Sequence, residues 1–288
     1  MPSPFERYLN YPLEVTIETT GRCNARCVFC PHSQIERKHT DMPDELFALI
    51  LEQLTMIPRE HRFYISPFKV NEMLMDRQIF ERIGMINRAL PGAMIRVFTN
   101  MGAATGKDLE QLCEIENLND IDISLNSLDA EEYHALMGLD LERTLGNVMR
   151  FLSLARSRGL SMHSRAITIS RVAQDAQSDA AFIDAFHKTF ERFADMAAPL
   201  VIARGEWIDF IPSATPLRQA QPCMRWLDVN LCCTGIAAFC CMDAHAAYPL
   251  GDVRESSVLD IYNQPRWRDL RIQQPHKSEI MPCKYCSQ

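Results

Sequence analysis

The sequence lacks an apolar run long enough to cross a membrane. No stretch approaches the roughly 18 consecutive apolar residues that a spanning helix needs. Residues 1–20 also lack the basic segment and continuous apolar run that mark a secretory signal. These absences predict a cytoplasmic protein with no membrane partner. Internal repeats and low-complexity tracts are missing as well, which is typical of a globular chain.

An excess of positive charge is also missing. The chain of 288 residues contains 30 Lys and Arg against 37 Asp and Glu, and its formal net charge is -7. Proteins that bind nucleic acid usually carry a basic stripe that follows the phosphates. We therefore expect no nucleic-acid partner and a small-molecule substrate that is neutral or positively charged.

Short β-branched runs alternate with amphipathic segments from residue 13 to about 205, which is typical of βα units around a parallel sheet. Six units are too few for a complete eight-stranded barrel, so we expect an α/β fold with an open, partial (β/α)6 barrel of the TIM type. Its site should lie at the carboxyl ends of the strands. The predicted strands are residues 13–17, 62–66, 94–100, 120–126, 162–170 and 199–205. One predicted helix begins at Asp41 and includes the apolar run 46–54. The other predicted helices are residues 76–89, 105–115, 141–158 and 179–194, and Gly159 is the expected C-cap of the helix 141–158.

The periodicity changes after about residue 210. Residues 212–222, PSATPLRQAQP, are polar and contain three prolines, and the segment that follows is weakly patterned and rich in cysteine. We expect a barrel of residues 1–212 and a small C-terminal domain of residues 213–288. A domain of that size usually needs a covalent or metal staple.

The chain contains 11 cysteines, an odd number that gathers near its two ends. Thiols stay reduced in the cytoplasm, so this distribution favours metal ligation over disulfides. Cys23, Cys27 and Cys30 form a CxxxCxxC motif, which lets three thiolates bind one 4Fe-4S cluster and leaves its fourth iron open. A zinc site with His32 as the fourth ligand is the alternative.

This motif resembles that of the radical S-adenosylmethionine (SAM) enzymes, in which CxxxCxΦC follows the first strand of a partial barrel. Phe29 occupies the aromatic Φ position. The resemblance implies that the three cysteines hold a 4Fe-4S cluster whose open iron binds SAM. An electron from a flavodoxin- or ferredoxin-like donor would then cleave SAM to methionine and a 5'-deoxyadenosyl radical, which abstracts hydrogen from the substrate.

Further stretches resemble the SAM-binding segments of that family. Glu72 in KVNEMLMD takes the place of a GGEP-like turn, although both glycines are missing. Thr99 and Asn100 in FTNMG resemble the TNG that ends the third strand. Ser124 and Asn126 in ISLNS occupy alternate positions of the fourth strand, so period two predicts that they share one face, and the resemblance implies that this face meets the SAM ribose.

Four positions near the fifth and sixth strands are ambiguous. Arg165 could bind the SAM carboxylate through its bidentate fork or could form a surface ion pair. Arg204, Glu206 and Trp207 follow the sixth strand, where they could contact substrate or simply cap the strand end. Arg204 is the predicted catalytic residue of this group.

Seven cysteines lie in the C-terminal region, and the run CMRWLDVNLCCTGIAAFCCMD resembles the SPASM or twitch extension of radical SAM enzymes. Aligning Gly235 to the glycine of that motif selects Cys240 over Cys241 as a ligand. Cys232 and Cys233 are either further ligands or small buried residues. The chain ends two residues after Cys286, which favours a twitch form with one auxiliary 4Fe-4S cluster. The implied ligands are Cys223, Cys240, Cys283 and Cys286.

An auxiliary cluster with four protein ligands cannot bind substrate, so its expected role is electron transfer during an oxidation. The architecture resembles the short twitch-type dehydrogenases, which oxidise an aminocyclitol alcohol to a ketone. We expect a radical SAM oxidoreductase that acts on a small polar substrate, either a sugar or a cyclitol.

Three alternatives stay open. A redox-neutral epimerase would use a thiol, predicted to be Cys241 with Cys232 and Cys233 as further candidates, to return hydrogen to the substrate. A ribosomal-peptide maturase is disfavoured, because only about twelve residues precede the first strand and such enzymes often carry a leader-binding module. A redox sensor or electron carrier would neither bind nor cleave SAM.

Overall fold

The computed structural model describes residues 3–160, 167–203, 207–208 and 222–286. One sheet runs through the molecule in the strand order β6-β5-β4-β3-β2-β1-β7-β8-β9. The first six strands are parallel neighbours in chain order, which confirms the predicted partial (β/α)6 barrel. They are β1 (Glu14–Ile17), β2 (Phe63–Ser66), β3 (Ala93–Thr99), β4 (Leu118–Ser124), β5 (Ile167–Val172) and β6 (Ala197–Ile202).

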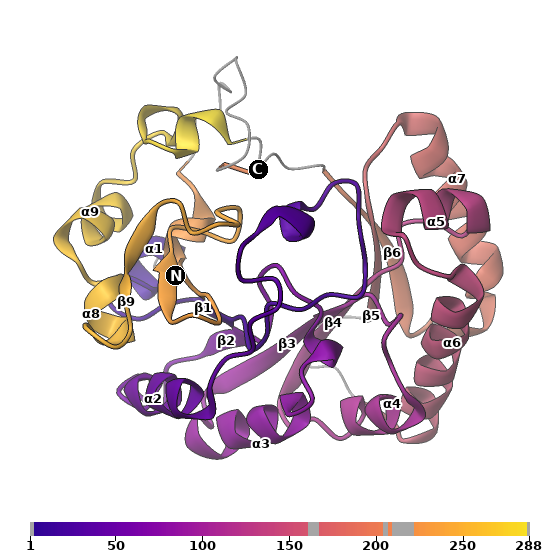
Figure 1. Ribbon diagram of the computed structural model, residues 1–288, viewed down its shortest axis with the longest axis horizontal. Coiled ribbons are helices and arrows are strands. Elements are labelled where there is room, and N and C mark those ends of the chain that lie inside the picture. The colour runs from indigo at the N-terminus through magenta and orange to yellow at the C-terminus, as the bar shows by residue number, and fades with distance from the viewer. Residues whose placement is uncertain (1–2, 161–166, 204–206, 209–221, 287–288) are drawn as a thin grey trace.

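Helices cover the outer face of the curved sheet, as Figure 1 shows. Their buried sides are apolar: Leu46, Phe47, Ile50 and Leu54 of α2 all belong to the main core, as their helical spacing predicts. The loop that follows β1 lies on the other, inner side of the sheet (Figure 1). The covering helices are α2 (Asp44–Leu54), α3 (Ile79–Ala89), α4 (Gly106–Leu112), α6 (Leu141–Ser157) and α7 (Ala176–Thr189), with the short η2 (Met73–Met75) and η3 (Glu191–Phe193) before α3 and after α7.

Two predicted helix boundaries change for local reasons. The helix predicted from Asp41 begins at Asp44, because the Asp41 carboxylate accepts a hydrogen bond from Thr20 and pairs with Arg22. The prediction of a C-cap at Gly159 is close: α6 ends at Ser157, and Gly159 follows with a φ of 62°.

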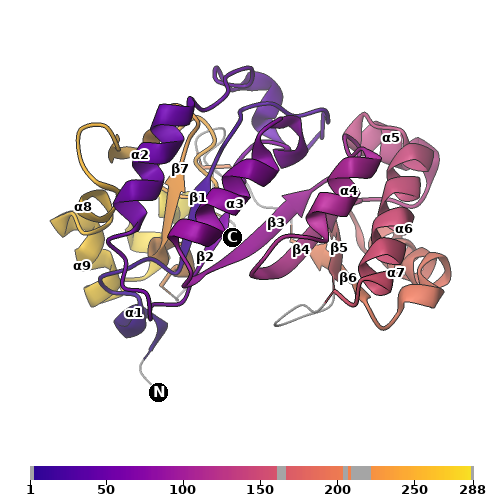
Figure 2. The same cartoon turned by 90° about the horizontal axis from the view of Figure 1, so that it is seen from below.

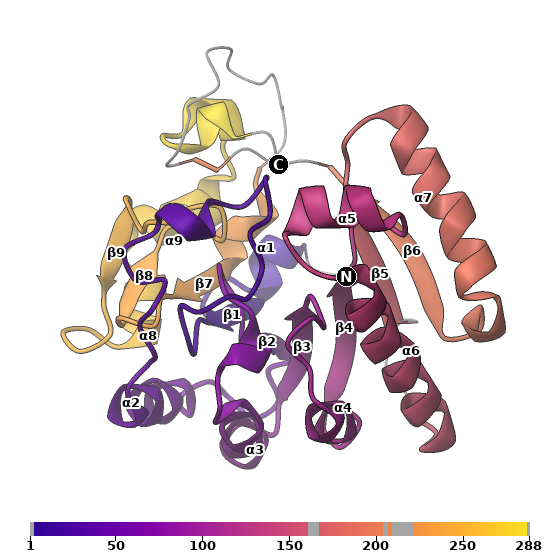
Figure 3. The same ribbon diagram turned by 45° about the vertical axis from the view of Figure 1, so that its right-hand side comes forward.

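Helix α5 (Ala130–Met137) lies between β4 and α6 and was not predicted from the sequence. Asp129 caps its N-terminus by accepting from the Glu132 N–H, and Gly138 ends it with a φ of 66°. The helix is short and mostly polar, so it lacks the long apolar stripe that identifies α6. In Figure 3, α5 lies beside the indigo segment that contains the first cysteine motif.

The C-terminal region extends the barrel sheet. Strand β7 (Asp228–Leu231) pairs in parallel with β1, and β8 (Ile236–Ala238) and β9 (Pro249–Asp252) continue in antiparallel fashion. Five short helices complete the region: η4 (Met224–Leu227), α8 (Val258–Tyr262), α9 (Pro265–Gln273), η5 (Lys277–Glu279) and η6 (Cys283–Tyr285).

The N-terminal segment packs on this region. Helix α1 (Pro4–Arg7) lies beside α9 (Figure 2). The Tyr262 hydroxyl donates to the Tyr8 carbonyl at 2.6 Å, and Arg271 Nε donates to the Leu9 carbonyl at 3.2 Å.

Several predictions fall outside the described residues. Arg165, Arg204 and Glu206 are among them, and so is the expected domain boundary at residue 212. Within the described part of the chain, no helix combines the length and apolar character needed to cross a membrane.

Candidate active site and cysteine clusters

The first cysteine motif forms a loop directly after β1, at the carboxyl ends of the barrel strands. Helix α5 supports this loop, because Arg26 N–H donates to the Met137 carbonyl at 2.8 Å and Val28 N–H donates to the Leu136 carbonyl at 3.0 Å. His32 is hydrogen-bonded to the Gly21 carbonyl at 2.7 Å. His32 is the second residue of η1 (Pro31–Gln34), so its ring ties this short helix to the base of the loop.

The three thiols of the loop are neighbours in a poorly solvated place. Burial raises the pKa of Cys23 to about 12. Burial also raises the pKa of Cys27, and negative charge on Cys30 and Cys23 adds to that effect. Burial raises the pKa of Cys30 as well. The three thiols hinder one another's ionisation. Bound iron would supply the opposite charge and stabilise all three as thiolates.

Glu72 organises the strand ends next to this loop. Its buried carboxylate accepts from the Thr99 hydroxyl at 2.7 Å and from the Asn100 N–H at 2.6 Å, and burial raises its pKa. Asn100 in turn donates to Asn24, inside the cysteine motif, at 2.9 Å. Glu72, Thr99 and Asn100 thus lie together, and the network ties β3 to the loop. Asn24 was missed because its spacing matches no motif.

The other predicted SAM contacts are more scattered. Ser124 is the last residue of β4, whereas Asn126 lies beyond the strand with a φ of 62°, so the predicted shared face does not hold. Asn126 Oδ1 accepts from the Val172 N–H at 2.8 Å, which joins the ends of β4 and β5. The Phe29 carbonyl accepts from the Trp207 indole at 3.0 Å. Trp207 therefore contacts the cysteine loop.

The second group of cysteines forms part of a separate apolar cluster. Cys240, Cys283 and Cys286 are buried in it with Trp226 and Leu227, and Cys223 packs against it. Burial raises the pKa of Cys283 to about 12, and negative charge on Cys223 and Cys286 contributes. Negative charge on Cys283 likewise adds to the burial that raises the pKa of Cys240. The four cysteines predicted as a ligand set are therefore neighbours.

Trp226 supplies a polar atom that fits an anionic sulfur. Its indole N–H is buried and has no hydrogen-bond acceptor of normal geometry within the described residues. Although burial dominates at Cys283, the Trp226 side chain opposes it and favours the thiolate there. A thiolate held by iron would satisfy this donor. The Cys-x-x-Trp pattern was visible in the sequence, but the role of the indole was not.

Cys241 does not belong to that apolar cluster, although it is adjacent to Cys240 and its charge acts on Cys240. Burial raises its pKa, and the largest charge effect on it comes from Arg225, followed by Asp228. Arg225 and Asp228 form an ion pair at 3.4 Å, and Glu14 of β1 lies 3.9 Å from the same guanidinium nitrogen. Cys232 and Cys233 lie apart from both groups, next to Glu18: the Cys233 N–H donates to its carboxylate at 3.1 Å.

The inner face of the barrel is polar. Arg96 of β3 forms ion pairs with Glu14 at 3.1 Å and with Asp120 at 3.3 Å, and Ser170 donates to Asp122. Burial raises the pKa of Asp122. Glu14 begins β1 and the cysteine loop follows its end, so the two lie about 10 Å apart along the strand.

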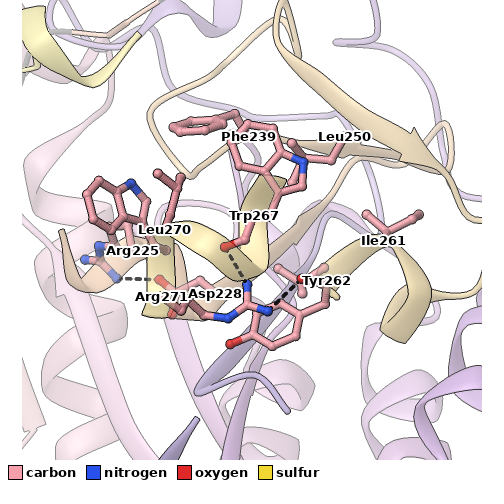
Figure 4. A pocket seen from close by; sticks show the side chains of 11 residues that line it. Arg225, Asp228, Phe239, Leu250, Ile261, Tyr262, Trp267, Leu270 and Arg271 are labelled. Atoms are coloured by element: carbon pink, nitrogen blue, oxygen red, sulfur yellow. Dashed lines mark hydrogen bonds and ion pairs between the residues drawn. The ribbon is translucent and has the colours of Figure 1, made fainter. Parts of the chain in front are cut away.

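A small pocket lies behind Asp228, between η4 and the helices α8 and α9 (Figure 4). Its volume of about 20 Å³ suits a water molecule and excludes a substrate. Arg271 stacks on the Tyr262 ring, 3.7 Å from its centroid, and donates to the Tyr262 carbonyl. The pocket is therefore part of the packing that fixes the Cys223 segment.

Within the described residues, no three Cys, His, Asp or Glu side chains converge closely enough to hold a single metal ion. A 4Fe-4S cluster places each thiolate on a different iron, so its ligands need not converge on one point. The two sets of cysteines therefore fit such clusters. Their thiols affect one another's pKa values, and the indole of Trp226 offers a donor to a cluster sulfur.

Comparison with protein-family models gives two matches that follow this division. The model of the radical SAM superfamily matches residues 17–183, more than half of the chain. The SPASM model, an iron-sulfur cluster-binding domain, matches residues 223–287. Both matches confirm the resemblance inferred from the cysteine spacing.

A curated relative is the S-adenosyl-L-methionine-dependent 2-deoxy-scyllo-inosamine dehydrogenase of Niallia circulans. It is 30% identical over 102 residues, which cover 35% of this chain and 40% of the relative. The aligned part thus spans less than half of either protein.

Several solved structures share the fold. BtrN in complex with AdoMet and 2-DOIA has a TM-score of 0.61 at 17% identity, covering 96% of this chain and 93% of its own. SuiB of Streptococcus suis bound to S-adenosylmethionine has a TM-score of 0.63 at 14% identity, covering 91% and 68%. Native anSMEcpe with bound AdoMet and Cp18Cys peptide has a TM-score of 0.64 at 13% identity, covering 95% of this chain and 87% of its own.

Proposed function

The chain belongs to the radical SAM superfamily, and we propose that it is an oxidoreductase that converts an alcohol of a small cyclitol- or sugar-like substrate to a ketone. Its family matches imply SAM and two 4Fe-4S clusters as cofactors. When bound, SAM and the first cluster supply a 5'-deoxyadenosyl radical that removes a hydrogen atom from the substrate. The dehydrogenase activity of the curated relative supports the oxidation.

Each cluster has a proposed ligand set. Cys23, Cys27 and Cys30 hold the first cluster and leave one iron open for SAM. The auxiliary cluster is held by Cys223, Cys240, Cys283 and Cys286. The observation that carries the proposal is that these four thiols are neighbours in one apolar cluster, so every iron of the auxiliary cluster has a protein ligand and the cluster can only exchange electrons.

The chain's own residues position the reaction. Glu72, with Thr99 and Asn100, fixes the strand ends beside the first cysteine loop, where SAM would bind. The substrate would occupy the polar interior below, where Asp122 is available as a proton acceptor because burial raises its pKa. After loss of a hydrogen atom, the substrate gives its hydroxyl proton to a carboxylate and one electron to the auxiliary cluster.

The reducing electron for SAM cleavage has to come from outside the chain. We propose a flavodoxin- or ferredoxin-like protein as its source. To test this, the rate of 5'-deoxyadenosine formation with reduced flavodoxin as the electron donor is compared with the rate with dithionite.

Iron and sulfide analysis after anaerobic reconstitution tests the two-cluster proposal. The wild type should contain about eight irons, and a Cys23/Cys27/Cys30→Ala variant and a Cys283/Cys286→Ala variant about four each. Only the first variant should fail to form 5'-deoxyadenosine from SAM with dithionite. A wild type with about four irons that are lost entirely in the first variant would contradict the auxiliary cluster.

A second candidate is a redox-neutral epimerase, and the position of Cys241 favours it. Apart from burial, the largest effects on this thiol come from the charges of Arg225 and Asp228, and Arg225 lies 3.9 Å from Glu14 of the inner face. It could return a hydrogen atom to a substrate radical. Product mass separates the two reactions, since oxidation removes two hydrogens, whereas epimerisation in deuterated water replaces one hydrogen of the substrate with deuterium.

A further inference from the structure

Two lysines are buried among the cysteines of the C-terminal region. Lys69 is 2% exposed and Lys277 is 3% exposed. Lys69 belongs to the loop after β2, and Lys277 begins η5, so the two charges come from segments that are far apart in the sequence. Lysine is rarely buried to this extent unless negative charge lies close by.

Lys69 reaches the segment that carries Cys240. Its Nζ donates to the Asp243 carbonyl at 2.5 Å, and the Asp243 N–H donates to the Cys240 carbonyl at 3.1 Å. Burial and the charge on Cys241 raise the pKa of Cys240, and Lys69 is a cation that opposes them. The carboxylate of Asp243 is directed to backbone N–H groups, those of Phe239, Ala247 and Tyr248.

Lys277 lies in the segment that comes just before Cys283 and Cys286. Helix η5 packs against η6, which contains Cys283 and is followed by Cys286. The charge of Lys277 counteracts the burial that raises the pKa values of Cys223 and Cys283. Lys69 and Lys277 therefore act on different members of the proposed ligand set.

A 4Fe-4S cluster with four thiolates carries a net negative charge, and one-electron reduction makes it more negative. A positive charge fixed nearby in a poorly solvated interior stabilises the reduced form more than the oxidised form, because the Coulomb interaction is weakly screened there. Net charge around a cluster is one of the features that set its reduction potential.

We propose that Lys69 and Lys277 raise the reduction potential of the auxiliary cluster and so make it able to accept the electron of the substrate radical. The inference rests on the proposed function, because it takes Cys223, Cys240, Cys283 and Cys286 as ligands. The electron balance is simple. The substrate radical loses one electron and its hydroxyl proton, and the cluster gains that electron while its core charge falls from 2+ to 1+.

A redox titration followed by electron paramagnetic resonance tests the inference. The Cys23/Cys27/Cys30→Ala background leaves the auxiliary cluster as the source of the signal. Into it we introduce Lys69→Gln or Lys277→Gln, each of which keeps a hydrogen-bond donor and removes the charge. Both should lower the midpoint potential, and the double variant should lower it further. Lys69→Arg and Lys277→Arg keep the charge and should stay near the wild-type value.

Lys107→Met is the matched control, because Lys107 is exposed on α4 and its loss should leave the potential unchanged. Iron content is measured for every variant. Glutamine variants that retain about four irons and titrate at the wild-type potential would overturn the inference. A background protein that binds no iron at all would instead refute the auxiliary cluster itself, which is a distinct result.

Discussion

Arg37 and Glu18 form a buried ion pair that joins the two cysteine regions. Arg37 Nε lies 2.5 Å from Glu18 Oε2, and Nη2 lies 3.0 Å from Oε1. The remaining nitrogen, Nη1, donates to the carbonyl of Ala244, four residues after Cys240. Arg37 follows the first cysteine loop and Glu18 follows β1, so the pair fixes three segments of the site against one another.

Removing Arg37 should be costly. An Arg37→Met variant leaves the Glu18 carboxylate buried without its partner, and breaking a buried pair in this way costs about 3–5 kcal/mol. Replacing both members, as Arg37→Met with Glu18→Gln, should recover much of the loss. Urea denaturation of the cluster-free proteins measures both effects. A loss below about 1 kcal/mol, the range of exposed pairs, would show that the pair is not buried in solution.

The cysteine loop also depends on a glycine. A Cβ added to Gly21 would lie 2.0 Å from the Arg37 carbonyl oxygen, and the Gly21 N–H donates to the Thr40 carbonyl at 2.7 Å. Backbone has to move to admit even a methyl group. Gly21→Ala should therefore distort the loop, and the reconstituted variant should contain about four fewer irons than the wild type.

Gly146 offers a control for that substitution. It lies within α6, and a Cβ there meets nothing within 4 Å. Gly146→Ala should raise stability by up to about 1 kcal/mol and leave the iron content at its wild-type value. Equal iron contents in both variants would contradict the role assigned to Gly21.

The local features of this fold could be predicted, and the contacts between distant segments could not. Alternating apolar runs predicted six strands, and their bounds agree with the structure to within two residues wherever the predicted bound falls on a described residue, because each strand buries residues that are close in sequence. The pairing of Arg37 with Ala244, or of Lys69 with Asp243, has no such periodic signature. Those contacts depend on how loops meet after β1, β2 and β8.

The predicted site divides along the same line. The cysteine pattern predicted two sets of thiols, and the members of each set are neighbours in the structure. Asn126 shows the limit of period two, since its left-handed backbone takes it off the β4 pattern. Trp226 and the two buried lysines escaped notice, because their importance depends on which sulfur each side chain approaches.

Cys240 and Cys241 should differ sharply in their effect on iron binding. Cys240 lies with Cys283 in the apolar cluster, whereas Cys241 is influenced chiefly by burial and Arg225. Cys240→Ala should therefore lose the auxiliary cluster, and Cys241→Ala should retain about eight irons. The reverse pattern would exchange the two assignments. If Cys241→Ala keeps both clusters and still oxidises substrate, the thiol has no part in turnover.

Asp228 should make the protein less stable as the pH rises toward neutrality. Burial raises its pKa to about 7, and the negative charge of Glu14 adds to the effect. Arg225 and Arg96 oppose the shift, and Cys241 is the thiol that faces the same group. The neutral carboxyl is thus the form that this environment favours.

The sign of the pH effect follows from proton binding. Between about pH 4 and pH 7 the folded state keeps a proton on Asp228 that the unfolded state has released, so stability falls across this range, by at most roughly 4 kcal/mol. Tyr262, which also faces Asp228, titrates far above this range because burial raises its pKa. Asp228→Asn removes the titration, so the stability of the variant relative to wild type should rise between pH 5 and pH 8. Urea denaturation of both cluster-free proteins at the two pH values measures this difference, and a constant difference would mean that Asp228 ionises as easily in the folded state as in the unfolded chain.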